Sequence, residues 1–246
     1  MSEAARAIQR LRSMVGASDS EVLDLGKILP RYFPVAWCVV PSLSVDSIRS
    51  WFAGRRLALP SSLEDCTNRR LRGGLMAQRG KAVLFIDGED EPAEQRYSLA
   101  HEGGHYLIDH RFPRDELLEQ FGDSILDVLN GLRQPALTER VDAVLNRSTL
   151  TTMTHLLERE SGVARMMAEA ESQADALAIE ALAPTAAVLR FLPALKDHPG
   201  EAVRVRQVLQ SEFAVPSDIA EFYAPRICVT CGRPIDFRAR FGLELA

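Results

Sequence analysis

The sequence has few of the features that mark secreted or membrane proteins. Its 246 residues include four scattered cysteines, which do not make the disulfide framework of a secreted domain. The amino terminus, MSEAARAIQRLRSMVG, has no apolar core of signal-peptide length. The most apolar stretch, Ala176 to Leu195, is interrupted by Glu180, Pro184, Arg190 and Pro193, which predicts packed helices rather than a membrane span. We therefore expect a cytoplasmic protein that does not insert into a membrane.

The chain also lacks a basic excess, internal repeats and low-complexity segments. Its 29 lysines and arginines are outnumbered by 34 aspartates and glutamates, which gives a net charge of −5. Because a nucleic-acid-binding protein usually shows a basic face, we expect no direct nucleic-acid binding. A hydrophobic content of 46% is ordinary for a globular protein, and 246 residues can bury a sizeable core.

What the sequence does contain is a metal-binding pattern in the stretch QRYSLAHEGGHYLIDH, Gln95 to His110. A helix turns about 100° per residue, so His101 and His105 lie on one face and can bind the same ion. Neutral imidazole suits zinc, and two nitrogens leave room for a third protein ligand and a water. Glu102 lies beside the first histidine, where it can accept a proton from that water. The H-E-x-x-H pattern on a helix is the signature of metalloproteases.

The residues around this motif predict a buried helix with a close neighbour. Apolar side chains flank the two histidines on both sides, so the ionisable residues among them need partners. Gly103 and Gly104 each lower helix propensity by about 1 kcal/mol relative to alanine. Two glycines in the middle of a helix therefore predict the close approach of another backbone or of a substrate.

A second helical run supplies a candidate third ligand. Glu171 and Asp175 are four residues apart in a segment that ends at Pro184, so they share one helix face. This spacing allows Glu171 to bind the metal while Asp175 accepts the outer N–H of a histidine ligand and fixes its tautomer. By itself an E-x-x-x-D pattern favours a solvated acidic face. Together with the H-E-x-x-H pattern it favours a metal site.

Two blocks of the chain resemble the ImmA/IrrE-type metallo-endopeptidases. SLAHEGGHYLIDH, Ser98 to His110, resembles that family's apolar-A-H-E-x-G-H block, and ESQADALAIEALAP, Glu171 to Pro184, is similar to its E-x-x-A-N/D-x-F-A-x-x-L-L-x-P block. The resemblance implies that His101, His105 and Glu171 bind zinc, that Glu102 is the general base, and that Asp175 supports a histidine ligand. The chain departs from the family at Leu177, where phenylalanine is usual, and in the separation of 66 positions from His105 to Glu171, which is longer than the family resemblance leads us to expect.

These patterns and the resemblance together predict an α+β fold, a zincin-like metalloprotease domain that is mostly helical, with a small β-sheet flanking the active-site helix. The domain is expected over residues 1–226, with a helical insertion at residues 111–164 and a short C-terminal appendage with a CxxC pair at residues 227–246. Strands are expected at 35–40, 71–78 and 81–87, and helices at 3–15, 20–29, 44–53, 165–183, 185–195, 200–213 and 217–223. A strand beside the metal helix offers an edge with which an extended peptide can pair.

Two further groups leave alternatives open. His155 lies in an apolar run, TTMTHLLER, where a lone histidine is most simply a core or surface residue; the alternative is a hydrogen-bond donor to a developing oxyanion. Cys228 and Cys231 have the spacing of one zinc knuckle, but a structural zinc needs four ligands and there is no second CxxC. A thiol pair on a turn is the simpler interpretation.

The function expected is zinc-dependent hydrolysis of a peptide bond in a specific intracellular protein. The family resemblance implies a helix-turn-helix transcriptional repressor as the substrate, and the acidic balance of the chain suits a basic protein partner. One alternative is an interaction module that keeps the zinc site but sequesters a regulator without cleaving it. Another is a zinc hydrolase of small substrates, such as an aminopeptidase.

Overall fold

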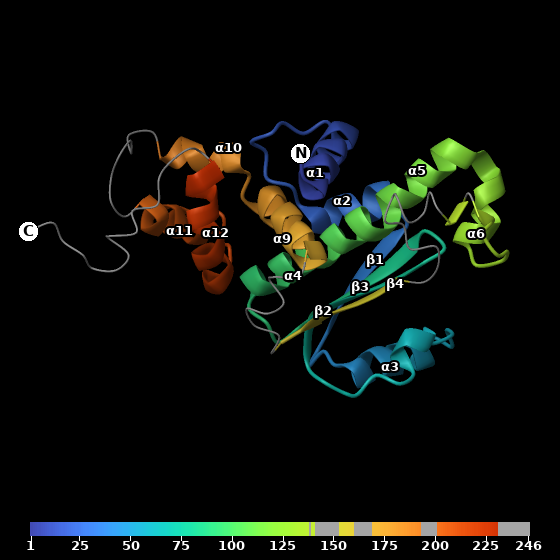
Figure 1. Cartoon of the computed structure of the whole chain (residues 1–246). Helices are drawn as coiled ribbons and strands as arrows, with labels where there is room; N and C mark the ends of the chain where they lie inside the picture. Colours follow the sequence, from blue (N-terminus) through green and yellow to red (C-terminus); the bar gives the residue numbers. More distant parts are fainter. Residues whose placement is uncertain (138, 141–152, 160–168, 193–200, 231–246) are drawn as a thin grey trace, which may run out of the picture.

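The protein is α+β, with helices on both faces of a four-stranded sheet (Figure 1). The computed structural model describes residues 1–137, 139–140, 153–159, 169–192 and 201–230. The helices are α1 (Glu3–Val15), α2 (Leu25–Tyr32), α3 (Val45–Gly54), α4 (Pro92–His105), α5 (Phe112–Phe121), α6 (Leu126–Leu129), α9 (Glu169–Leu182), α10 (Thr185–Val188), α11 (Glu201–Ser211) and α12 (Ser217–Thr230). A π-helical turn, Tyr106–Arg111, continues α4. The predicted class, mostly helical with a small sheet, is confirmed.

The sheet has the order β1-β3-β2-β4, with strands β1 (Val35–Val40), β2 (Leu71–Gln78), β3 (Lys81–Asp87) and β4 (Met153–Glu158). β1 is parallel to β3, whereas β2 is antiparallel to both β3 and β4. The β2–β3 hairpin turns at Arg79 and Gly80, which both have positive φ, as the tightest hairpin turns require. The three strands predicted from the sequence are confirmed.

Alternate residues of the central strands face two different cores. Leu75, Leu84 and Ile86 pack with α1, α2, α4 and α9 in the main core. Met76 and Phe85 point the other way, toward α3. This two-residue alternation follows from the pleat of a strand, and it leaves the metal helix packed on one face of the sheet and α3 on the other (Figure 1).

The second helix differs from the prediction at both of its ends. We expected it to begin after Ser20 and to stop at Pro30, but it begins after an Asp24 cap and runs to Tyr32. Proline cannot donate to the carbonyl four residues earlier, which here belongs to Gly26. The indole N–H of Trp37 donates to that carbonyl at 3.0 Å, so the helix continues through Pro30 with its backbone acceptor satisfied.

The prediction of an entirely helical insertion at residues 111–164 is wrong in its later part, because residues 153–158 form the edge strand β4. Only one residue of β4, Thr154, is β-branched, so pairing with β2 rather than local propensity selects the strand. The helical character expected for the start of this insertion is found in α5 and α6. Residues 138, 141–152 and 160–164 of it lie outside the described residues.

Helix α12 crosses the expected boundary at residue 226. It continues to Thr230, and Ile227 and Cys228 are buried in the main core. Cys228 therefore lies on a helix rather than on the expected turn, while Cys231 and the remainder of the expected appendage lie outside the described residues. No helix in the described part of the chain is both long and apolar enough to cross a membrane.

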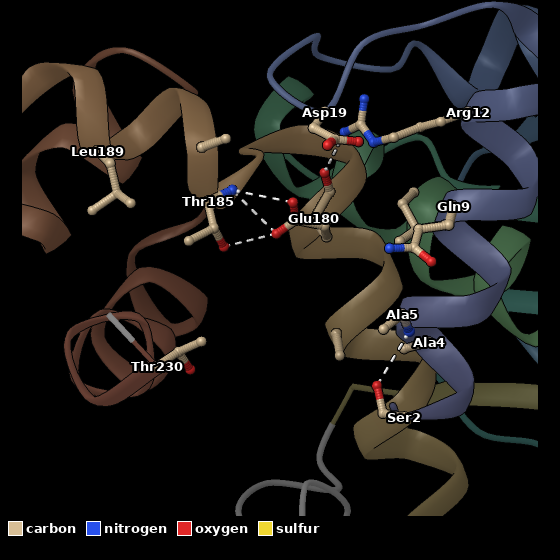
Figure 2. Close-up of a pocket in the computed structure, with 13 residues that line it drawn as sticks. Ser2, Ala4, Ala5, Gln9, Arg12, Asp19, Glu180, Thr185, Leu189 and Thr230 are labelled. Carbon is tan, nitrogen blue, oxygen red and sulfur yellow. Dashed lines mark hydrogen bonds between the residues drawn. The ribbon is translucent and has the colours of Figure 1, made fainter. Parts of the chain in front are cut away.

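A cavity of about 590 Å³ lies between α1, α9 and α10, away from the sheet (Figure 2). Most of its lining is small or apolar, and several of its polar side chains hydrogen-bond to neighbouring elements. The Glu180 carboxylate accepts from the backbone N–H and the hydroxyl of Thr185, while Arg12 donates to the carbonyl of Glu180. These bonds join the end of α9 to α1 and α10.

Candidate metal centre

Helix α4 carries two histidines whose side chains are almost fully buried. His101 is 0% exposed and His105 is 1% exposed. The Nδ1 atom of each ring makes a hydrogen bond with a carboxylate, His101 with Asp175 at 2.7 Å and His105 with Asp109 at 2.7 Å. The Nε2 atoms are buried and make no hydrogen bond to any described residue. A carboxylate on one ring nitrogen fixes the tautomer that leaves the other nitrogen free to bind a metal.

Helix α9 brings Glu171 and Asp175 to the same histidines. The Glu171 carboxylate lies 3.6 Å from His101 Nε2 and 3.5 Å from His105 Nε2. Asp175 also accepts the hydroxyl of Tyr97 at 2.5 Å, so its orientation is fixed from two sides. All five residues predicted for the site, the two histidines with Glu102, Glu171 and Asp175, are therefore brought together.

The two glycines of α4 account for the closeness of the helices. A Cβ at Gly104 would lie 3.0 Å from the backbone oxygen of Ala174 on α9, and a Cβ at Gly103 would lie 2.8 Å from a methyl group of Leu29 on α2. The predicted close approach of another backbone is confirmed at Gly104. The missing side chain lets α9 pack directly against the metal helix, which places Glu171 and Asp175 within reach of the histidines.

A third histidine, His155, joins the group from strand β4. Its Nδ1 lies 2.9 Å from Glu102 Oε2, and its Nε2 lies 2.8 Å from Glu171 Oε1. Its ring stacks on that of His105 with the centroids 3.8 Å apart. The interpretation of His155 as an isolated core or surface residue is therefore wrong, because the strand aims its ring into the predicted site.

Burial and opposite charge compete in setting the pKa values of the cluster. Burial lowers the pKa of His155, but the carboxylates of Glu102 and Glu171 outweigh burial and raise that pKa to about 10. Burial likewise lowers the pKa of His101, and its contacts with Asp175 and Glu171 raise it above the ordinary value. Burial alone would raise the pKa of Glu171; the three histidines instead hold that pKa well below the usual range.

The donor set fits a single transition-metal ion. His101, His105, His155 and Glu171 each offer one ligand atom, and these four atoms all lie within 4.8 Å of one another. Imidazole nitrogens with one carboxylate oxygen are the donors that zinc sites use, although other divalent metals accept them as well. Burying two Nε2 atoms with no hydrogen-bond partner among the described residues is costly unless another group satisfies them, and a metal ion would do so.

One member of the site, Asp109, is not predicted from the sequence, and the role of another, His155, is left open by it. Asp109 follows His105 by four residues, and that helical spacing is the signal that could have found it. His155 offers a weaker signal, because its partners are 53 and 16 residues away in the chain.

Comparisons of the chain with protein-family models, with curated proteins and with solved structures gave no match.

Proposed function

We propose that the protein is a zinc-dependent endopeptidase with a zincin-like active site. The observation that carries this proposal is the convergence of His101, His105 and Glu171 from two helices, with Glu102 beside them and with a carboxylate on Nδ1 of each of the two helical histidines. Such supporting carboxylates orient histidine ligands in metal sites. The H-E-x-x-H spacing adds the acid–base residue that hydrolysis requires.

The residues of the chain divide the chemistry between them. His101, His105 and Glu171 would hold the ion. A bound zinc ion would lower the pKa of a water molecule and polarise the carbonyl of the scissile bond. Glu102 accepts a proton from the attacking water and passes it to the leaving amine nitrogen. Its Oε1 atom is buried and has no hydrogen-bond partner among the described residues.

The sheet gives a substrate a place to bind. Within the described part of the chain, β4 pairs only with β2, so its other edge can accept a further strand. An extended peptide on this edge would pass the side of the sheet from which His155 reaches the metal group. A peptide bound in this way passes close to Glu102, and so an internal peptide bond is a better fit than the small substrate of an aminopeptidase.

Metal analysis together with one substitution tests the proposal. The purified protein should carry about one zinc ion per chain, and His101→Ala should lose it. Glu102→Gln should keep the zinc and lose hydrolysis, because only the proton acceptor is changed. Undiminished cleavage by Glu102→Gln would refute the assignment of Glu102 as the base.

For the substrate, we propose a helix-turn-helix repressor cleaved at one site in an interdomain linker. This choice follows from the resemblance of the two sequence blocks to ImmA/IrrE-type enzymes and from the net charge of −5, which would steer a basic partner. Zinc-loaded protein should fragment one candidate repressor and leave casein largely intact, as mass spectrometry would show. Tight repressor binding without fragments, equal in Glu102→Gln, would favour sequestration instead.

A further inference from the structure

His155 shares with the two helical histidines one arrangement that the proposed mechanism does not use. In all three rings, Nδ1 contacts a carboxylate, at 2.7 Å, 2.7 Å and 2.9 Å for His101, His105 and His155. In all three, Nε2 lies beside the carboxylate of Glu171. The partner of His155 is Glu102, the residue assigned as the base. The pattern of a carboxylate on one nitrogen and the shared site on the other is that of a metal ligand with its supporting acid.

We propose that in the resting protein His155 is a fourth ligand of the metal and Glu102 is the carboxylate that orients it. Catalytic zinc sites have three protein ligands and an open position, whereas four protein ligands make a closed site. The resting centre is therefore closed, and it opens when His155 withdraws and releases Glu102. This inference rests on the proposed function, since it assigns a closed state to the same site.

The spacing of the four donors supports one shared ion. Ligand atoms about 2.0–2.1 Å from a tetrahedral ion lie roughly 3.3 Å from each other. The Glu171 oxygens lie 3.6 Å from His101 Nε2, 3.5 Å from His105 Nε2 and 2.8 Å from His155 Nε2. The contacts of His101 and His105 are close to this spacing, whereas His155 Nε2 hydrogen-bonds directly to Glu171 Oε1 and would have to move away by about 0.5 Å for both atoms to bind one ion.

The contact between His155 and Glu102 also occupies the base. Oε2 of Glu102 is taken by His155 Nδ1, and Oε1 is buried at the position where a Cβ on Gly73 of β2 would come within 3.0 Å. While His155 stays in place, the carboxylate has one oxygen engaged and the other turned toward the sheet. Withdrawal of one imidazole would therefore free a coordination position and the base together.

His155 is the ligand that can leave. His101 and His105 are fixed in a helix that packs against α2, α9 and the sheet, and their side chains are 0% and 2% exposed. The His155 side chain is 16% exposed and stands on a strand at the edge of the sheet. The strand itself is held, because Arg159 at its end bonds to Asp87 and Asp90 at 2.7 and 2.6 Å. Opening therefore requires rotation of a side chain rather than loss of the strand.

Cobalt substitution tests the fourth ligand without using activity. The wild-type protein and His155→Ala would be loaded with Co²⁺, and their visible spectra recorded with and without a small hydroxamate, which binds an open metal position. His155→Ala should have an altered spectrum and should respond to the hydroxamate at a concentration at least about 10-fold lower than the wild type does. Its zinc affinity, measured by competition with a chelator, should fall at least about 10-fold.

A neighbouring residue provides the matched control. Thr154 precedes His155 on β4 and contacts the hydroxyl of Ser62 outside the metal group, so Thr154→Val should keep the wild-type spectrum and zinc affinity. Equal spectra, equal hydroxamate response and equal zinc affinity in His155→Ala and the wild type would overturn the proposal and return His155 to substrate binding. If His155→Ala does not fold, His155→Asn takes its place. A wild-type spectrum that already responds to micromolar hydroxamate would also overturn the proposal.

The outcome is separable from that of the proposed function. If no variant cleaves any peptide but the spectra differ as expected, the four-ligand centre stands and the endopeptidase assignment fails. If the spectra and affinities are identical while Glu102→Gln abolishes cleavage, the endopeptidase stands and the closed resting state fails.

Discussion

At the scale of single residues, the carboxylates that contact Nδ1 of the histidines fix the orientation of these rings. Asp175 is 1% exposed and holds His101 Nδ1 at 2.7 Å while it accepts the hydroxyl of Tyr97. Without it, the imidazole loses both its preferred tautomer and its fixed orientation. The imidazole would then still be present, but it would no longer be oriented to bind a metal.

Asp175→Ala should therefore weaken zinc binding by about 10–100-fold while the fold is retained. Chelator competition gives the zinc dissociation constant, and circular dichroism checks the fold. Asp46→Ala is the control, because Asp46 pairs with Arg49 on the far side of the sheet and should leave zinc binding unchanged. An unchanged constant in Asp175→Ala would mean that His101 does not need this acid.

Gly73 on β2 makes room for the base. A Cβ at this position would lie 3.0 Å from Glu102 Oε1 and 3.1 Å from Glu102 Cγ, so Gly73→Ala should push the carboxylate out of place. We expect at least about a 10-fold loss of peptidase activity with zinc retained, because none of the ligands is touched. Gly74→Ala is the matched control on the same strand, since its Cβ would meet its nearest atom at 3.4 Å. Equal activities in the two variants would exclude this steric effect.

Site residues could be predicted from the sequence where residues with metal-binding side chains are spaced four apart on one helix. His101 and His105 are four apart on one helix, as are Glu171 and Asp175, and the structure brings the two pairs together. His155 could not be predicted in the same way. A strand offers no repeating face with a second ligand, and the partners of His155 are reached only when β4 is placed beside α4.

At the scale of elements, the packing of α4 against α9 builds the site. The contact depends on Gly104, where a Cβ would meet backbone atoms of Ala174 at 3.0 and 3.1 Å. A backbone cannot yield as the end of a side chain can. A methyl group at Gly104 therefore requires the backbone of α9 at Ala174 to give by a few tenths of an ångström, on the helix that carries Glu171 and Asp175.

Gly104→Ala should lower the zinc affinity more than Gly103→Ala does. Both changes gain about 1 kcal/mol of helix propensity, which partly offsets an overpacking cost of about 1–3 kcal/mol. Gly103→Ala meets only the flexible Leu29 side chain, so α9 should stay in place. Urea unfolding and zinc competition on both variants measure the two effects. Equal zinc affinities would show that the spacing of α4 and α9 does not control the ligands.

Elements were predictable where one local signal dominated. The strands at 35–40, 71–78 and 81–87 and the helix at 3–15 match the predicted bounds, because a short apolar run, a turn at Arg79-Gly80 and a helical apolar period mark them locally. Two of the failures have a cause that lies in a distant part of the chain. Trp37 satisfies the carbonyl that Pro30 leaves open, so the helix does not stop there. Pairing with β2 likewise selects a strand for residues 153–158.

At the scale of the whole molecule, the chain tolerates buried charge only where a partner or a shifted pKa removes its cost. In the cluster of three histidines and Glu171, the opposite charges of neighbouring side chains offset the cost of burial. His110 does it by losing its proton: it is 3% exposed, neither ring nitrogen has a hydrogen-bond partner among the described residues, and Arg114 and Arg111 lie nearby. Burial first, and then the two arginines, lower its pKa to about 4.

This buried histidine should make the protein less stable in mild acid. The folded-state pKa of His110 is about 4, below the value near 6.5 in the unfolded chain, so the unfolded state binds the proton first as the pH falls. Its contribution to stability is complete above pH 6.5 and is lost between pH 6.5 and 4, which amounts to about 2 kcal/mol between pH 7 and pH 5. Urea unfolding of the metal-free protein at the two pH values measures the loss.

His110→Leu cannot bind a proton, so its unfolding free energy should fall by about 2 kcal/mol less than that of the wild type over the same interval. The other histidines are the same in both proteins, so the difference isolates His110. Equal losses in the two proteins would show that His110 takes up its proton as easily in the folded chain as in the unfolded one.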